Sequence, residues 1–106
     1  MTVVELILWS GCPSTEEARE LLNRALSEAG LPSQKITERY IEDYQIAQEE
    51  KFIGSPTFRV NGEDVIQSGE HQAYGLTCRV YQKADGRFSP LPEYAAVVAG
   101  IKRLSA

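Results

Sequence analysis

The sequence is poor in the side chains that bind metals and attack electrophiles. Its 106 residues include two cysteines, one histidine, one methionine and one tryptophan. Structural zinc sites are built from Cys and His side chains that together fill every position around the metal. Two cysteines and one histidine cannot complete that set, so we expect no structural zinc site formed by this chain alone.

Long apolar runs and basic clusters are also missing. A membrane span needs about 18 or more consecutive apolar residues, and no run approaches that length. The chain has 11 basic and 15 acidic residues, a formal net charge of −4, and no cluster of Lys or Arg. These features argue against a membrane or a nucleic acid as its main partner.

The beginning of the sequence and its cysteine content predict a compartment. Residues 1–12 lack the basic segment and the small-residue cleavage site of a secretory signal peptide, which predicts a strand there and a cytoplasmic location. Thiols stay reduced in the cytoplasm, so we expect no structural disulfide between Cys12 and Cys78. With 42% hydrophobic residues, the chain can form one core but not two. We therefore predict a single domain over residues 1–106.

The first half of the chain alternates strand and helix patterns. Val3–Trp9 is almost continuously apolar, as in a strand covered on both faces. Residues 18–29 carry apolar side chains at helical spacing, and Gly30 follows as a stop signal. Residues 34–41 predict a second strand, and residues 42–51 predict a helix with a weak apolar face.

A hairpin follows in the second half. Thr57–Val60 and Asp64–Ile66 flank Asn61 and Gly62, the pair that best suits a two-residue type I′ turn. The predicted order is therefore β-α-β-α-β-β. Such an order indicates an α/β domain with a mixed central sheet.

Two more elements are expected after the hairpin. Leu76, Cys78 and Val80 alternate with polar residues, which predicts an extra short strand or an extended segment with Cys78 on its buried face. A final helix is predicted from near Pro92, because proline suits a first helical position. Its apolar stripe consists of Tyr94, Val97, Val98, Ile101 and Leu104.

Two local motifs make this order more specific. The first is Ser-Gly-Cys-Pro-Ser-Thr at residues 10–15, and the second is Phe-Ile-Gly-Ser-Pro-Thr at residues 52–57. Together they resemble the active-site turn and the cis-proline loop of the thioredoxin and glutaredoxin-like superfamily, over nearly the whole chain. With Leu-Thr-Cys-Arg-Val-Tyr at residues 76–81, the chain also resembles small bacterial thioredoxin-family proteins of unsettled function, some of which carry mercury-related names. The resemblance implies a thioredoxin-like fold.

The resemblance also implies a site centred on Cys12. A thiol at a helix N-terminus faces unpaired backbone N–H groups and the positive end of the helix dipole, which favour the thiolate. The superfamily pattern implies that Pro13, Thr15, Ser55 and Pro56 contact the substrate. In particular, it implies that Ser55 offers backbone groups to an extended thiol-bearing substrate and that the bond before Pro56 is cis.

The sequence departs from the dithiol pattern at Thr15, where dithiol members have a second cysteine. A hydroxyl cannot resolve a mixed disulfide, so three chemistries remain open. Cys12 works as a monothiol with glutathione as co-substrate, or Cys78 resolves the intermediate, or Cys12 binds a soft ligand without turnover. Glu16 and Glu17 follow in the first helical turn, where their charges oppose a nearby thiolate.

Smaller features complete the expected site. Ser14 and Glu17 are spaced for a capping box, which starts the helix after Cys12 and weakens the effect of its dipole on the thiol. Arg79 lies beside Cys78 in sequence and offers it a positive charge. The stretch 67–70 partly matches a glutathione-binding segment, and His71 is interpreted as a solvated loop residue.

We expect a thiol-disulfide oxidoreductase that acts on protein or glutathione disulfides, with Cys12 and Cys78 as the candidate catalytic residues. No resident cofactor is expected, and the partner is a disulfide-containing protein or a small thiol. The alternative is a non-catalytic module whose thiols bind a soft metal such as Hg(II) or a partner protein. The sequence gives no expectation for the oligomeric state.

Overall fold

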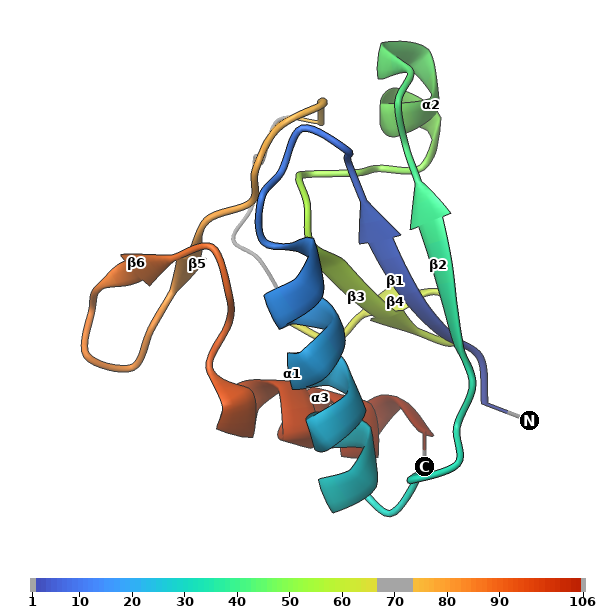
Figure 1. Cartoon of the computed structure of the whole chain (residues 1–106), viewed down its shortest axis with the longest axis vertical. Coiled ribbons are helices and arrows are strands. Elements are labelled where there is room, and N and C mark those ends of the chain that lie inside the picture. Colours follow the sequence, from blue (N-terminus) through green and yellow to red (C-terminus); the bar gives the residue numbers. More distant parts are fainter. Residues whose placement is uncertain (1, 67–73, 106) are drawn as a thin grey trace.

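The computed structural model describes residues 2–66 and 74–105, so the segment 67–70 and His71 lie outside the described residues. Its elements alternate as the sequence predicts (Figure 1). They are β1 (Val4–Leu8), α1 (Thr15–Glu28), β2 (Ile36–Tyr40), α2 (Tyr44–Glu49), β3 (Thr57–Val60), β4 (Glu63–Asp64), β5 (Tyr81–Gln82), β6 (Phe88–Ser89) and α3 (Tyr94–Ser105).

A mixed sheet of order β2-β1-β3-β4 forms the centre of the domain. β1 pairs with β2 in parallel, with Val4 opposite Ile36, and pairs with β3 antiparallel, with Leu6 opposite Phe58. β3 and β4 are antiparallel neighbours. The predicted α/β class with a mixed sheet is therefore confirmed.

Helices cover both faces of β1, which explains why that strand is apolar along its length. Leu6 and Leu8 belong to one buried cluster with residues of α1 and α3. Ile7 points to the opposite face, where it packs with Ala47 of α2 and with Phe52. Figure 1 shows α1 and α3 together over one face of the sheet.

The helix boundaries follow the predicted stop and start signals closely. α1 ends at Glu28, and Gly30 after it adopts a positive φ of 89°. α3 begins at Tyr94, slightly later than the predicted start near Pro92. In the part of the chain that the structure describes, none of the helices is long and apolar enough to cross a bilayer.

The predicted hairpin turn is confirmed, because Asn61 and Gly62 have φ values of 54° and 84°. The Asn61 side chain also accepts a hydrogen bond from the Val3 N–H at 2.9 Å. β4 ends at Asp64 instead of Ile66. The physical reason is local: the Asp64 carboxylate accepts the Ile66 N–H at 2.9 Å and turns the chain out of the ladder.

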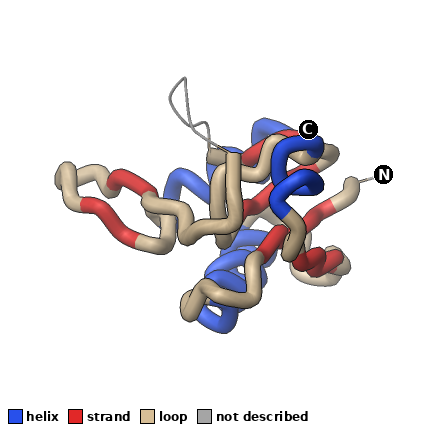
Figure 2. The backbone as a smooth tube through the Cα atoms, turned by 90° about the horizontal axis from the view of Figure 1, so that it is seen from above, coloured by secondary structure: helices blue, strands red, loops and turns tan. Residues whose placement is uncertain are grey.

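The extra strand does not lie where the alternation predicts it. β5 begins at Tyr81 and pairs with β6 as a separate hairpin, which extends away from the helices and the central sheet (Figure 2). Residues 76–80 before it belong to neither sheet, and an isolated parallel bridge between Ser55 and Cys78 joins them to the loop before β3.

Close packing of α3 on the β4 end yields the first testable prediction. A Cβ atom added at Gly100 would lie 2.3 Å from the Val65 carbonyl oxygen. Gly100→Ala is therefore expected to lower the free energy of unfolding by about 1–3 kcal/mol, because the backbone must shift to admit the methyl group. Urea denaturation measures the change.

The matched control is Ala99→Ser, at an exposed position of the same helix, which should lower the free energy of unfolding only by the difference in helix propensity, about 0.5 kcal/mol. Helix propensity alone favours alanine over glycine by about 1 kcal/mol. A Gly100→Ala protein as stable as the wild type, or more stable, would contradict the close approach.

Candidate functional site

Cys12 lies in the turn between β1 and α1 instead of inside the first helical turn. Its N–H donates to the Trp9 carbonyl at 3.0 Å, and α1 begins only at Thr15, with Ser14 as its N-cap residue. The predicted capping box is wrong in detail, because the Ser14 side chain makes no capping hydrogen bond. The late helix start is confirmed: Cys12 precedes the N-cap residue Ser14 by two positions.

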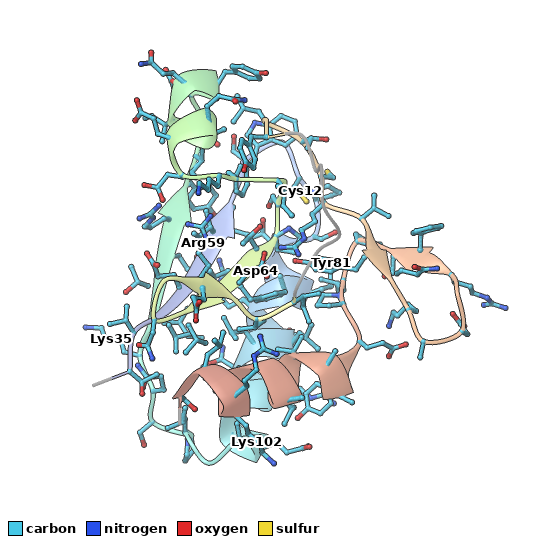
Figure 3. All side chains as sticks on the ribbon, turned by 180° about the vertical axis from the view of Figure 1, so that it is seen from behind. Cys12, Lys35, Arg59, Asp64, Tyr81 and Lys102 are labelled. Atoms are coloured by element: carbon cyan, nitrogen blue, oxygen red, sulfur yellow. The ribbon has the colours of Figure 1, made fainter. Side chains whose placement is uncertain are left out.

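The Cys12 thiol is buried at the loop before β3. The residue is 6% exposed, and its Sγ–H donates to the Ser55 carbonyl at 3.4 Å. The Ser55–Pro56 bond is cis, as expected. Figure 3 shows Cys12 at the end of the sheet, above Asp64 and Tyr81 in that view.

Ser55 does not offer free backbone groups to a substrate. Its N–H donates to the Thr77 carbonyl at 2.9 Å, and its carbonyl accepts the Arg79 N–H at 2.8 Å. Gly54 permits this approach, since a Cβ there would lie 2.7 Å from the Arg79 nitrogen. The expectation that Ser55 pairs with an extended substrate is therefore corrected: residues 77–79 of the same chain already occupy those groups.

This pairing brings Cys78 next to Cys12. Cys78 is the bridge partner of Ser55, whose carbonyl accepts the Cys12 thiol. Partial desolvation raises the pKa of the Cys78 thiol, and its interaction with Cys12 raises it further. Two cysteines far apart in sequence thus meet at the same residue, Ser55, and both are free cysteines in this structure.

The alternation around Cys78 has the opposite phase from the one predicted. Cys78 is exposed and Val80 is 63% exposed, whereas Arg79 and Tyr81 are 4% and 3% exposed. The prediction of a buried Cys78 is wrong for a physical reason. Arg79 and Tyr81 find polar partners inside the fold, so they take the inward positions that an apolar pattern would assign to Cys78 and Val80.

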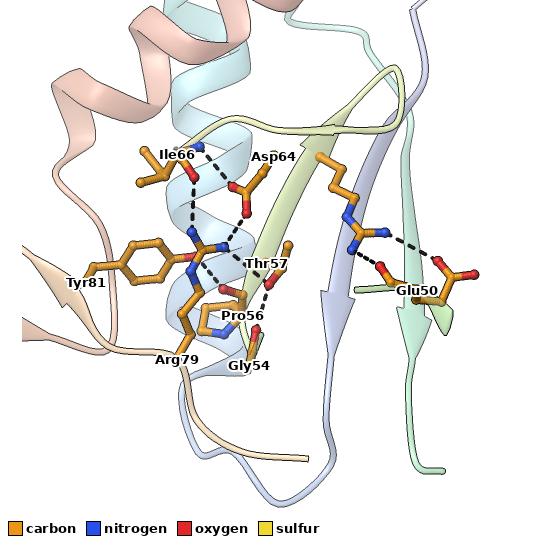
Figure 4. Close-up of polar contacts among 9 residues, drawn as sticks. Glu50, Gly54, Pro56, Thr57, Asp64, Ile66, Arg79 and Tyr81 are labelled. Atoms are coloured by element: carbon orange, nitrogen blue, oxygen red, sulfur yellow. Dashed lines mark hydrogen bonds and ion pairs between the residues drawn. The ribbon is translucent and has the colours of Figure 1, made fainter. Parts of the chain in front are cut away.

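The Arg79 guanidinium lies in a polar network with Asp64, Ile66 and Tyr81 (Figure 4). It donates to the Asp64 carboxylate at 2.6 Å and to the Ile66 carbonyl at 3.1 Å, and it stacks on the Tyr81 ring at 4.4 Å. Arg79 therefore does not supply positive charge to Cys78, as the sequence had suggested. It anchors the segment that bears Cys78.

Tyr81 completes the anchor. Its hydroxyl donates to the Pro56 carbonyl at 2.5 Å, and burial raises its pKa well above the ordinary value, so the hydroxyl keeps its proton. The sequence alone did not identify Asp64 and Tyr81 as residues of this site. It also did not predict that the Arg79 side chain points into the fold. One sequence feature could have indicated that Arg79 and Tyr81 act together: their Arg-x-Tyr spacing, which places both side chains on one face of an extended segment.

The remaining expected contacts are less closely tied to the thiols. Pro13 is exposed and Thr15 is half-buried. Trp9 packs on the α2 side of the sheet and closely covers Gly11, where a Cβ would lie 2.5 Å from its ring.

The turn before Cys12 is also held by hydrogen bonds to Glu42, which the sequence did not predict. The Ser10 N–H donates to the Glu42 carboxylate at 2.8 Å, and the Ser10 hydroxyl donates to the same group. Both bonds hold the pKa of Glu42 below its usual value. Within residues 2–66 and 74–105, no group of three or more His, Cys, Asp or Glu side chains is placed to hold a metal ion.

Comparisons with protein-family models, with curated proteins and with solved structures found no match to this chain.

The Arg79 network yields a prediction about stability. Arg79→Met removes the partner of Asp64 and leaves the Ile66 carbonyl unpaired, so the free energy of unfolding should fall by about 2–4 kcal/mol. Urea denaturation measures the loss. The matched control is Arg87→Met, at an exposed position of the β5–β6 hairpin, which should leave the midpoint unchanged. Equal midpoints for the two variants would refute the anchoring role.

The effect of Cys12 on Cys78 yields a prediction about the pKa of the Cys78 thiol. Cys12→Ala removes the interaction with Cys12 that helps to raise the pKa of Cys78, but not the partial desolvation of the thiol, which contributes most. The Cys78 pKa should therefore fall in this variant while staying above its ordinary value. Site-resolved alkylation across alkaline pH, followed by mass spectrometry, measures it.

Ser10→Ala is the matched control, since Ser10 lies in the same turn but bonds to Glu42 instead of a thiol. It should leave the alkylation profile of Cys78 unmoved. A Cys78 profile that is identical in the wild type and in Cys12→Ala would show that the thiols do not interact.

Proposed function

We propose that this chain is a thiol-disulfide oxidoreductase of thioredoxin-like fold, with Cys12 and Cys78 as its redox pair. The observation that carries the proposal is that both cysteines meet at Ser55: its carbonyl accepts the Cys12 thiol, and Cys78 is its bridge partner. Two cysteines separated by most of a chain need a specific arrangement to meet. Here that arrangement is provided by two backbone hydrogen bonds and a buried anchor.

The thioredoxin-like assignment rests on three features taken together. The element order, the sheet order β2-β1-β3-β4 and the cis Ser55–Pro56 loop beside the Cys12 turn agree with the superfamily pattern. Fold does not determine function, so the proposed activity depends on the thiol pair and not on this likeness.

Cys78 supplies the second thiol that a dithiol mechanism needs and that Thr15 cannot provide. In thiol-disulfide exchange a thiolate attacks a disulfide sulfur, and a second thiol then releases the bound half of the substrate. The product on the protein is a Cys12–Cys78 disulfide, and the substrate is reduced to two thiols. Glutathione as co-substrate, a protein substrate and the cytoplasmic location stay predictions.

The proposal predicts that mild oxidation joins the two thiols within one molecule. Treating the reduced protein with diamide should remove two hydrogen atoms and protect both cysteines from alkylation, and a reductant should reverse the change. Intact-mass and peptide mass spectrometry measure this directly. The denatured, reduced protein serves as a control for total thiol content.

The single variants Cys12→Ser and Cys78→Ser are the matched controls, and both should lose catalysed disulfide reduction. Catalysis that persists in Cys78→Ser but not in Cys12→Ser would support the monothiol mechanism instead. An oxidised wild type linked between chains, with no bond within the chain, would refute the proposed pair.

The same thiol pair favours one second candidate, the binding of a soft thiophilic ion. Two adjacent thiolates suit Hg(II) or Cu(I). Titration with Hg(II) should then show one ion per chain, with tight binding lost in both Cys12→Ser and Cys78→Ser. Equal affinity in the wild type and both variants would dismiss this candidate.

A further inference from the structure

The two thiols differ in their access to solvent. Cys12 is 6% exposed, and its thiol is turned to the Ser55 carbonyl. Cys78 is exposed, and so are its neighbours Thr77 and Val80. A disulfide from solution must bring one of its sulfur atoms against the attacking thiolate, so the rate of the first step depends on this access.

The usual way to guide an extended polypeptide to a buried thiol is also closed. A polypeptide substrate would gain affinity from backbone hydrogen bonds along an unpaired edge. At Ser55, however, both backbone groups are already bonded to Thr77 and Arg79. The buried network of Arg79 with Asp64 holds this segment in place.

We propose that disulfide exchange begins at Cys78, the exposed thiol, and that the buried Cys12 is the resolving thiol. The substrate class that fits is a small aliphatic disulfide, because it needs no backbone pairing at Ser55. This inference rests on the proposed function, in which Cys12 and Cys78 form a disulfide. It assigns the order of the two steps.

The steps balance in atoms and electrons. The Cys78 thiolate attacks one sulfur of R–S–S–R, which forms a Cys78–S–S–R mixed disulfide and expels R–S⁻. The Cys12 thiolate then attacks Cys78 Sγ, which forms the Cys12–Cys78 disulfide and expels the second R–S⁻. Each leaving thiolate takes up the proton that a cysteine has released. The protein dithiol is oxidised by two electrons, and the small disulfide is reduced to two thiols.

The raised pKa of Cys78 slows this first step only in part. A higher pKa lowers the thiolate fraction at neutral pH, but it also makes the thiolate a stronger nucleophile, with a Brønsted coefficient of about 0.4–0.5. Roughly half of the loss per pKa unit is therefore recovered. The burial of Cys12 has no such compensation, because a thiolate that the substrate cannot reach does not react.

Trapping with bis(2-hydroxyethyl) disulfide as the probe tests the order of the steps. Cys12→Ser should accumulate a stable mixed disulfide on Cys78, roughly tenfold or more faster than Cys78→Ser acquires one on Cys12. In 8 M urea, about the concentration that unfolds small domains, both variants should react at similar rates. That control shows that the fold, and not the local sequence, sets the difference.

Early-time quenching of the wild type provides a second measurement that needs no variant. The short-lived adduct should be found on Cys78. An adduct on Cys12, or trapping in Cys78→Ser as fast as in Cys12→Ser, would overturn the proposed order. The proposed function fails separately, if the wild type keeps a mixed disulfide and never forms the Cys12–Cys78 bond.

Discussion

The backbone carbonyl of Ser55 is the constraint on which the rest of this site depends. It accepts two hydrogen bonds at once, from the Arg79 N–H at 2.8 Å and from the Cys12 thiol at 3.4 Å. One oxygen atom therefore ties the turn after β1 to the segment before β5. The Ser55 N–H, which donates to the Thr77 carbonyl at 2.9 Å, and the Gly75 N–H, which donates to the Phe52 carbonyl at 3.0 Å, hold the same segment against the loop.

The surrounding fold makes this shared acceptor rigid. Pro56 is buried, and its carbonyl is held by the Tyr81 hydroxyl. Arg79 is held by Asp64 at the end of the β3–β4 hairpin. A buried charge is costly unless it is paired and hydrogen-bonded, so an arginine with these partners has one favourable position. The thiol pair thus depends on a polar network that contains no thiol.

Much of the fold could be predicted from the sequence, whereas the pairing of the site residues could not. The apolar run of β1, the helical stripe of α1 and the turn at Asn61 are local signals. The structure contains the strand, the helix and the turn that they predict. The phase of residues 76–81 is different, because it depends on partners far along the chain. Local alternation favours a buried Cys78, yet Asp64 and Pro56 supply tertiary bonds that draw Arg79 and Tyr81 inward instead. Such bonds are invisible in a local pattern.

The candidate site, too, could be predicted only in part from the sequence. Cys12 and Pro56 follow from short motifs, but the occupied backbone of Ser55 does not, because it depends on a segment that folds back over the loop. An equilibrium redox titration of the native chain, with thiol labelling at each point, tests the central claim most directly. The account predicts that Cys12 and Cys78 become protected together, as one two-electron couple within a single chain. Separate midpoints for the two cysteines, or oxidation only between chains, would contradict it.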